Sequence, residues 1–271
     1  MTAAEPGPEL RIADLRTAYD VTAARWAAGP RPVYTSLADA LLARARLTPA
    51  GARLTGGRVL DLGAGTGVAG RAARRAGARS VVCTDSAAGM LRHCEAGLHP
   101  VLADLTALPF GDGGFDLALA AFCLGHLPRP VAGLREARRV AGALAASSFA
   151  AGWNHPAKAA VDQVLTRFGY QSPPWYVTFK RETEPWASDP AALGRDLAAA
   201  GYAAVQLQTV TVDTGLSSPA ELAAWRLGMA HVAPFVGSLT ATRQADLRHA
   251  AQAAVAGTGP LVVAMLVLTA C

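Results

Sequence analysis

The chain has 271 residues, 52% of them hydrophobic, which is enough to bury the core of a single domain that carries an insertion or a cap. The net charge of +5 comes from arginines scattered through helical stretches, without a basic cluster interleaved with aromatic residues, so the sequence argues against nucleic acid as a partner. Four cysteines without C-x-x-C spacing predict neither a metal site nor a disulfide framework.

Membrane insertion and secretion are not predicted either. The longest apolar run, residues 261–268, is shorter than the about 20 residues that a membrane-spanning helix needs. The first ten residues contain proline and glutamate but no apolar stretch of the kind that signal peptides carry. We therefore expect a cytoplasmic protein that binds a small molecule, with no nucleic-acid or membrane partner. The sequence does not determine its oligomeric state.

The N-terminal part is predicted to be helical after a polar tail, residues 1–12. Apolar positions recur with helical spacing over residues 12–28, and a second helical stretch, residues 34–46, follows the break at Gly29 and Pro30. The aromatic side chains of these helices either pack on the core or face a ligand, and their spacing does not distinguish the two. They are Tyr19, Trp26 and Tyr34.

A short apolar strand, residues 58–62, runs directly into a glycine-rich turn, and a helix at residues 68–76 follows. Gly63, Gly65 and Gly67 allow the backbone to turn tightly and to approach a ligand that a Cβ atom would push away. This arrangement is typical of the nucleotide-binding corner of an α/β fold, with the ligand where strand becomes helix.

Two kinds of ligand are consistent with this turn. The spacing of Gly65, Gly67 and Gly70 fits the fingerprint of dinucleotide-binding folds, in which a helix N-terminus binds pyrophosphate. Asp61 argues against that ligand, because a carboxylate two residues before the first glycine repels phosphate and attracts an ammonium or sulfonium group. The turn therefore favours a ligand that carries a positive charge.

Three further motifs follow in chain order. They are a strand at 80–85 that ends in Asp85, 20 residues after Gly65; the segment 101–105 with Asp104; and an apolar strand at 115–121 followed by a loop with His126. Together with the glycine turn, they resemble the motifs of class I S-adenosylmethionine-dependent methyltransferases, over about residues 15–150.

The resemblance implies an S-adenosylmethionine site. Asp85 is expected to accept hydrogen bonds from both ribose hydroxyls and Asp104 from the adenine amino group, while the N-terminal helices cover the cofactor as a lid. Ser86 is expected to cap the next helix, whose Met90 either lies on the adenine ring or belongs to the core. The predicted cofactor-binding residues are Asp61, Gly63, Ala64, Gly65, Asp85, Ser86, Met90, Asp104, Leu105 and Ala121.

The resemblance also implies the fold class: a Rossmann-like α/β domain with a seven-stranded, mostly parallel sheet of order 3-2-1-4-5-7-6, whose last strand is antiparallel. The turn at residues 140–142 is shorter than in the family, which puts the geometry of the neighbouring strand in doubt. The further elements are expected at 100–103, 131–139, 143–149, 191–200, 205–212, 219–231 and 261–269. The predicted divisions are a tail and lid at 1–50, a cofactor-binding core at 51–150, a cap at 151–190 and the rest of the α/β domain at 191–271.

The cap is rich in proline and holds three of the five tryptophans, including Trp153 and Trp175. Large aromatic side chains after the fifth strand suggest the substrate side of a pocket, where flat apolar walls orient an acceptor. A packed cap without ligand contact is the alternative.

Methyl transfer mainly requires that the acceptor be held close to and in line with the methyl group, so a base is optional. His126, after the fourth strand, and His155, after the fifth, are the candidate catalytic residues. The leading hypothesis is O-, N- or C-methylation of a small molecule, with secondary metabolism suggested by the resemblance. The alternatives are another reaction on the same cofactor, such as cyclisation or elimination, an accessory subunit, and a nicotinamide-dependent oxidoreductase.

Overall fold

A seven-stranded sheet in the order β3-β2-β1-β4-β5-β7-β6 forms the centre of the computed structural model, which describes residues 8–50, 53–127 and 129–271. Strands β1 to β5 are parallel, and β7 lies antiparallel between β5 and β6. The predicted strand order is confirmed. The strands are β1 Arg58–Leu62, β2 Ser80–Asp85, β3 His99–Leu102, β4 Leu117–Ala121, β5 Leu144–Phe149, β6 Val205–Asp213 and β7 Val262–Ala270.

Neighbouring residues of the central strands face opposite layers of helices. Val59 belongs to the core that contains α2 (Arg31–Ala45) and α3 (Val68–Arg75), whereas Leu60 packs with α5 (Pro130–Val140) and α9 (Pro190–Ala199). Because both faces of the sheet are covered, the central strands are apolar without alternation. The short turn before β5 does not disturb the sheet, since β5 pairs with both β4 and β7.

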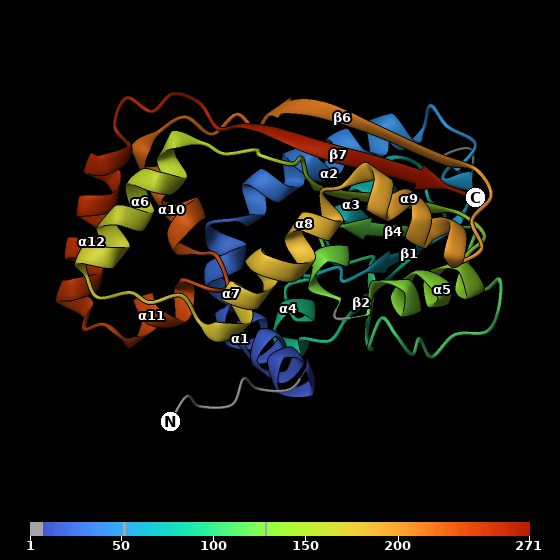
Figure 1. Ribbon diagram of the computed structural model, residues 1–271, viewed down its shortest axis with the longest axis horizontal. Coiled ribbons are helices and arrows are strands. Elements are labelled where there is room, and N and C mark those ends of the chain that lie inside the picture. Colours follow the sequence, from blue (N-terminus) through green and yellow to red (C-terminus); the bar gives the residue numbers. More distant parts are fainter. Residues whose placement is uncertain (1–7, 51–52, 128) are drawn as a thin grey trace.

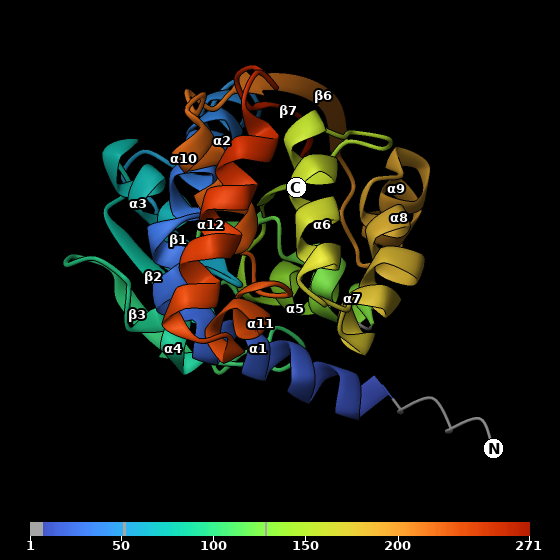
Figure 2. The ribbon, with the colours of Figure 1, turned by 90° about the vertical axis from the view of Figure 1, so that its left-hand side faces the viewer.

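A second group of helices lies beside the sheet, at the left of Figure 1: α6 (Pro156–Arg167), α10 (Pro219–Leu227), α11 (Ala233–Ser238) and α12 (Ala241–Val255). α6 packs against both α10 and α12, and Figure 2 shows α6 and α12 side by side. The predicted cap thus packs on helices that the sequence assigned to the α/β domain.

α11 and α12 were not predicted. The buried stripe of α12 consists of Leu247, Ala251 and Val255, and further alanines lie on its other faces, so the apolar periodicity is weak in the sequence. The predicted helix at 219–231 ends earlier, at Leu227, with Gly228 at its C-cap.

The N-terminal helices flank the break at Gly29 and Pro30 as predicted, although α1 (Pro8–Ala28) begins before residue 12. The first seven residues of the predicted tail lie outside the described residues. No helix in the described part of the chain is both long and apolar enough to cross a bilayer. The remaining helical elements are α4 Ala88–Leu91, η2 Leu124–His126, α7 Pro174–Thr178, η3 Phe179–Thr183 and α8 Glu184–Ala187.

Candidate active site

A cavity of about 1220 Å³ lies where β1, β2, β4 and β5 end, and extends to α6 and α10. This is the position at which open α/β sheets bind ligands. Its wall contains every site residue predicted from the sequence except His155. The lid, the cofactor motifs and the cap therefore enclose one space.

The glycine turn forms the floor of the cavity next to β1. Gly63 and Gly65 both have φ of +56°, a conformation that favours glycine. A Cβ atom on Gly63 would lie 2.6 Å from Cβ of Cys123, and one on Gly65 would lie 3.1 Å from Cε of Met90. The Gly65 N–H donates to Asp85 Oδ2 at 2.8 Å, which connects the turn to the end of β2.

Two carboxylates lie beside this turn, Asp61 buried and Asp85 half-buried. Asp61 is 1% exposed, and its Oδ2 accepts the Gly70 N–H at 2.7 Å, while its buried Oδ1 has no partner among the described residues. Burial raises the pKa of Asp61 to about 7. Asp85 accepts a second N–H, from Ala87, at 2.9 Å, and burial raises its pKa as well.

Asp85, and not Ser86 as predicted, accepts a backbone N–H at the start of α4. Ser86 lines the cavity, but α4 begins only after Ala87, and no side chain caps it. The predicted N-cap at Ser86 is therefore wrong, and Asp85 provides the acceptor for the Ala87 N–H. Met90 of this helix is 1% exposed and packs with Trp26 and Ala87, so it is a core residue that also borders the cavity.

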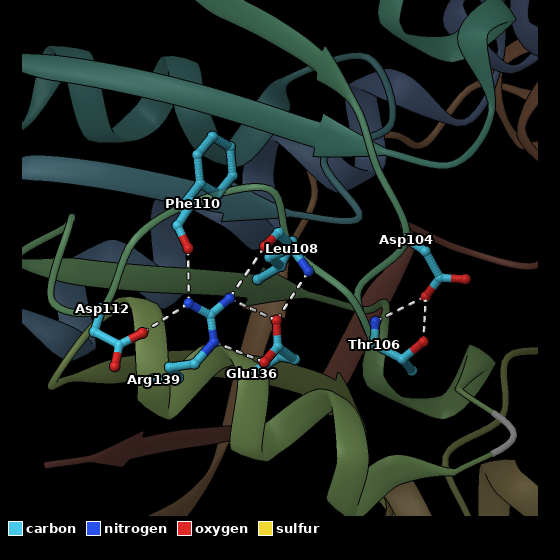
Figure 3. A network of polar contacts seen from close by, with 7 residues as sticks. All are labelled: Asp104, Thr106, Leu108, Phe110, Asp112, Glu136 and Arg139. Carbon is cyan, nitrogen blue, oxygen red and sulfur yellow. Dashed lines mark hydrogen bonds and ion pairs between the residues drawn. The ribbon is translucent and has the colours of Figure 1, made fainter.

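Asp104 is presented by a loop that α5 holds in place (Figure 3). Its Oδ1 accepts both the N–H and the hydroxyl of Thr106, each at 2.7 Å. The guanidinium of Arg139 donates to the carbonyls of Phe110 and Leu108 at 2.7 and 3.1 Å. Glu136 accepts from Arg139 and from the Leu108 N–H, and its hydrogen bonds with Arg139 are the main reason that its pKa is lowered. The motif alone did not identify this support.

The lid and the loop after β4 meet at His126. Its Nε2 lies 3.1 Å from the Tyr19 hydroxyl, and its ring stacks on Phe179 with centroids 4.7 Å apart. The buried Nδ1 has no partner among the described residues. Burial lowers the pKa of His126 to about 4, so the ring is neutral at physiological pH. Burial also raises the pKa of Tyr19.

An aromatic wall continues from the end of β5. The rings of Phe149 and Trp153 stack with centroids 4.8 Å apart at 9°, and the Trp153 indole N–H donates to the Val262 carbonyl at 3.0 Å. Tyr34 contacts this wall edge-on through Phe149 and also lies 5.2 Å from the Trp26 ring. Two separate segments, the lid and the predicted cap, thus line the same side of the cavity.

Trp175 also borders the cavity but serves packing as well. It is 7% exposed and belongs to a small cluster with Ala18 and Ala230, with its ring 6.5 Å from that of Tyr19. It therefore joins α7 to α1.

Comparison with known proteins identifies the family of this chain. Residues 59–142 match the family model described as "Methyltransferase domain". The demethylmenaquinone methyltransferase of Thermobifida fusca is 30% identical over 178 residues, which cover 58% of this chain and 73% of the relative. The chain belongs to the class I S-adenosylmethionine-dependent methyltransferases. The predicted cofactor of this methyltransferase, S-adenosylmethionine, is confirmed.

Other matches are shorter or more distant. The demethylmenaquinone methyltransferase of Beutenbergia cavernae is 42% identical over 105 residues, or 38% of this chain. That match spans 43% of the relative, less than half its length. The solved structure of the cyclase SpnF has a TM-score of 0.51 and 20% identity, and the alignment covers 87% of this chain and 80% of that one. At this identity the likeness shows the fold alone.

The residues of this methyltransferase fit the cofactor at one end of the cavity. The two positive-φ glycines leave space that side chains would fill, and the unpartnered Oδ1 of Asp61 provides a buried acceptor next to it. Asp85 and Asp104 retain acceptor capacity, because a carboxylate oxygen can accept more than one hydrogen bond.

His155 lies outside the cavity wall, contrary to its predicted catalytic role. Its Nδ1 accepts the Ala157 N–H at 3.2 Å and thereby caps α6, while its Nε2 lies 3.0 Å from the Pro260 carbonyl. Both ring nitrogens are therefore occupied by backbone groups. Position after β5 did not suffice as a criterion, because Trp153 and Lys158 on either side of His155 line the cavity while the His155 ring binds backbone groups.

The sequence missed several residues of the wall. Phe122, which follows β4, is the one non-glycine residue of the described chain with positive φ, at 57°, and it packs edge-on against Tyr34. The sequence predicted the strand before Phe122 but gave no sign of the strained backbone at this residue. Lys158 of α6 and Arg226 of α10 also line the cavity, although they are 68 residues apart in the chain.

Proposed function

We propose that the chain transfers the methyl group of S-adenosylmethionine to a small, flat acceptor that binds against Phe149 and Trp153. The observation that carries this proposal is that one cavity joins the cofactor motifs to an aromatic wall. S-adenosylmethionine supplies an electrophilic methyl group on a positively charged sulfur. The predicted division into lid, core and cap is part of the proposal.

The aromatic wall contributes orientation. The rings of Phe149 and Trp153 are stacked and nearly parallel, and the hydrogen bond from the Trp153 indole N–H to the Val262 carbonyl fixes the Trp153 ring. A flat acceptor stacked on this wall has few orientations available, which raises the fraction of productive geometries. The apolar rings also exclude water from the site.

His126 is proposed to bind the reacting group of the acceptor. If its Nε2–H donates to the Tyr19 oxygen, the buried Nδ1 keeps an unpaired lone pair, and in the opposite tautomer it keeps an unpaired N–H. A pKa of about 4 makes His126 a weak base at neutral pH. Its main contribution is therefore a directed hydrogen bond to the acceptor. His126 would remove a proton only from an acceptor that is itself acidic.

The names of the relatives support one class of acceptor. Those compared above are named for demethylmenaquinone, a quinone, and a quinone-type ring would suit a wall of stacked aromatic side chains. Natural-product biosynthesis and a cytoplasmic location remain predictions from the sequence.

Two measurements test the proposal. Calorimetry should show binding of S-adenosylhomocysteine, and incubation with S-adenosylmethionine and a panel of flat phenols, quinols and arylamines should yield S-adenosylhomocysteine together with a methylated product, both detected by mass spectrometry. Asp85→Ala serves as a control that should lose both signals. An acceptor converted without consumption of S-adenosylmethionine would instead indicate a cyclase or another non-methylating reaction, and absence of cofactor binding would contradict the proposal.

A further inference from the structure

The part of the cavity formed by α6, α10 and the segment around η3 has more cations than carboxylates to pair them. Arg226 donates to both oxygens of Asp162, each at 2.8 Å. Lys180 forms an ion pair with Glu184. The ammonium of Lys158 has no carboxylate partner among the described residues, although its side chain lines the same space. One positive charge is therefore left over.

Lys158 has a carboxylate on its own helix but does not pair with it. Asp162 lies one helical turn after Lys158 on α6, a spacing that favours an ion pair, yet among the described residues its carboxylate pairs with Arg226. The Lys158 ammonium instead lies 4.9 Å from the centre of the Trp153 ring. The other carboxylate of this wall, Asp189, caps α9 through the Ala191 N–H.

Burial is the main reason that the pKa of Lys158 falls to about 8, and the charges of Arg226 and Lys180 lower it further against the opposing effect of Glu184 and Asp162. An ammonium that has lost much of its water without gaining a carboxylate is held at a cost in free energy. A bound anion would remove that cost, because it would supply the missing partner in a site of low dielectric.

We propose that the acceptor carries a carboxylate, which the Lys158 ammonium binds while the attached flat ring lies on the Phe149–Trp153 wall. The Lys158 ammonium lies over the Trp153 ring, so the cation and the Phe149–Trp153 wall border the same part of the cavity. A single unpaired cation matches a monoanion, whereas a phosphate dianion would bring a second charge without a partner. This inference rests on the proposed function, since it takes the occupant of this wall to be the acceptor.

The test compares aryl carboxylates with their amides, which have nearly the same shape but no charge. With S-adenosylhomocysteine present at saturation, binding of 2-naphthoate and 2-naphthamide, and of benzoate, cinnamate and indole-3-acetate with their amides, is measured by calorimetry. At least one carboxylate should bind about tenfold more tightly than its amide, the strength of one charge-assisted hydrogen bond. If no carboxylate of the panel binds better than its amide, the proposal is wrong.

Three variants locate the effect. Lys158→Met should remove the preference for the carboxylate and leave the affinity for the amide unchanged, and Lys158→Arg should keep the preference. Arg167→Met, at the end of the same helix and outside the cavity wall, removes the same charge and should change neither affinity. Equal loss in Lys158→Met and Arg167→Met would mean that only the overall charge matters, and loss of both carboxylate and amide binding would assign Lys158 a packing role.

The two proposals fail in different ways. Binding of S-adenosylhomocysteine and formation of a methylated product do not require a carboxylate preference, so a negative result with the amide pairs leaves the proposed methyl transfer standing. Conversely, a carboxylate preference that depends on Lys158 without any turnover would support the anion site and contradict methyl transfer.

Discussion

The two ends of the cavity are constructed differently. At the cofactor end, adjacent parallel strands determine the geometry: Leu62 of β1 pairs with Thr84 of β2, so the turn after one strand meets Asp85 at the end of the other. At the proposed acceptor end, Phe149 of β5 and Trp153 in the turn after it meet side chains of separate helices, such as Arg226 of α10, which pairs with Asp162 of α6, 64 residues away. Backbone register fixes the first end, and helix packing fixes the second.

This difference has a functional consequence. A cofactor site made of backbone turns and strand-end carboxylates tolerates few substitutions, because the ligand contacts the main chain itself. The proposed acceptor site, which is lined by side chains rather than by backbone turns, can change its lining while the sheet stays the same. The following predictions test whether the two ends respond independently to substitution.

The largest effect is expected for Gly65→Val. The new side chain would point toward Met90 in a backbone conformation that valine avoids, so affinity for S-adenosylhomocysteine should fall by more than about 100-fold in calorimetry. Gly97→Val is the matched control, because Gly97 also has positive φ, of +87°, but has open space around its Cα and lies outside the cavity wall. Comparable losses in both variants would mean that backbone strain, and not ligand approach, is what matters.

Asp85→Ala should weaken cofactor binding next most strongly, by about 100-fold, because the two charge-assisted hydrogen bonds expected to the ribose hydroxyls contribute at least about 1.5 kcal/mol each. Part of the loss is expected from the turn itself, since Asp85 also accepts the Gly65 N–H. Asp112→Ala removes an exposed carboxylate that binds Arg139 and should have no comparable effect. Unchanged affinity in the Asp85 variant would contradict its assignment to the ribose.

Trp153→Ala should reduce turnover by about tenfold and leave cofactor affinity within about twofold, because a shortened wall lets the acceptor adopt unproductive orientations. The control is Trp186→Ala, which removes the same side chain from a position outside the cavity wall, where the indole binds Asp196. Steady-state kinetics and calorimetry on each variant provide the readout. Full turnover in Trp153→Ala would make the wall a structural cap, and joint loss of cofactor binding would couple the two ends.

The smallest effect concerns pH. Burial raises the pKa of Asp61 to about 7, so in the free protein this carboxyl becomes charged as the pH rises through neutrality. A ligand that carries an ammonium favours the charged form, and its affinity should therefore increase by about threefold from pH 6 to pH 8. Calorimetry with S-adenosylhomocysteine in that range measures the change. Asp61→Asn should abolish the slope, and a slope that persists there would have to come from another group, such as Asp85.

The raised pKa of Asp61 also affects folding stability. A carboxyl group whose pKa is higher in the folded than in the unfolded state lowers the free energy of unfolding as the pH rises from the unfolded pKa to the folded one. Without ligand, burying the Asp61 carboxyl therefore destabilises the fold less in acid than at neutral pH. A carboxylate that is paired in the folded state behaves in the opposite way. A cationic ligand bound next to Asp61 is expected to remove this cost of burying the carboxylate.

The sequence by itself determined the fold class and predicted the cofactor end. Alternation of short apolar strands with helices indicated a mostly parallel sheet, and the family resemblance supplied its order. Gly63, Gly65, Asp85 and Asp104 each lie at or just after a strand end, where neighbouring elements meet. The same local logic failed for Ser86 and His155, because which backbone N–H a side chain caps depends on where the helix begins, to within one residue.

Only the tertiary structure decided the acceptor end. Nothing in the local sequence relates Lys158 to Arg226, 68 residues away in the same cavity wall, or the Tyr19 hydroxyl to His126, 107 residues away. These contacts depend on how α1, α6 and α10 pack, and the alanine-rich α12 that supports this packing carries little periodic signal. Strand register is specified by nearest neighbours along the sheet, whereas the relative placement of helices follows from the sum of many weak contacts across the whole chain.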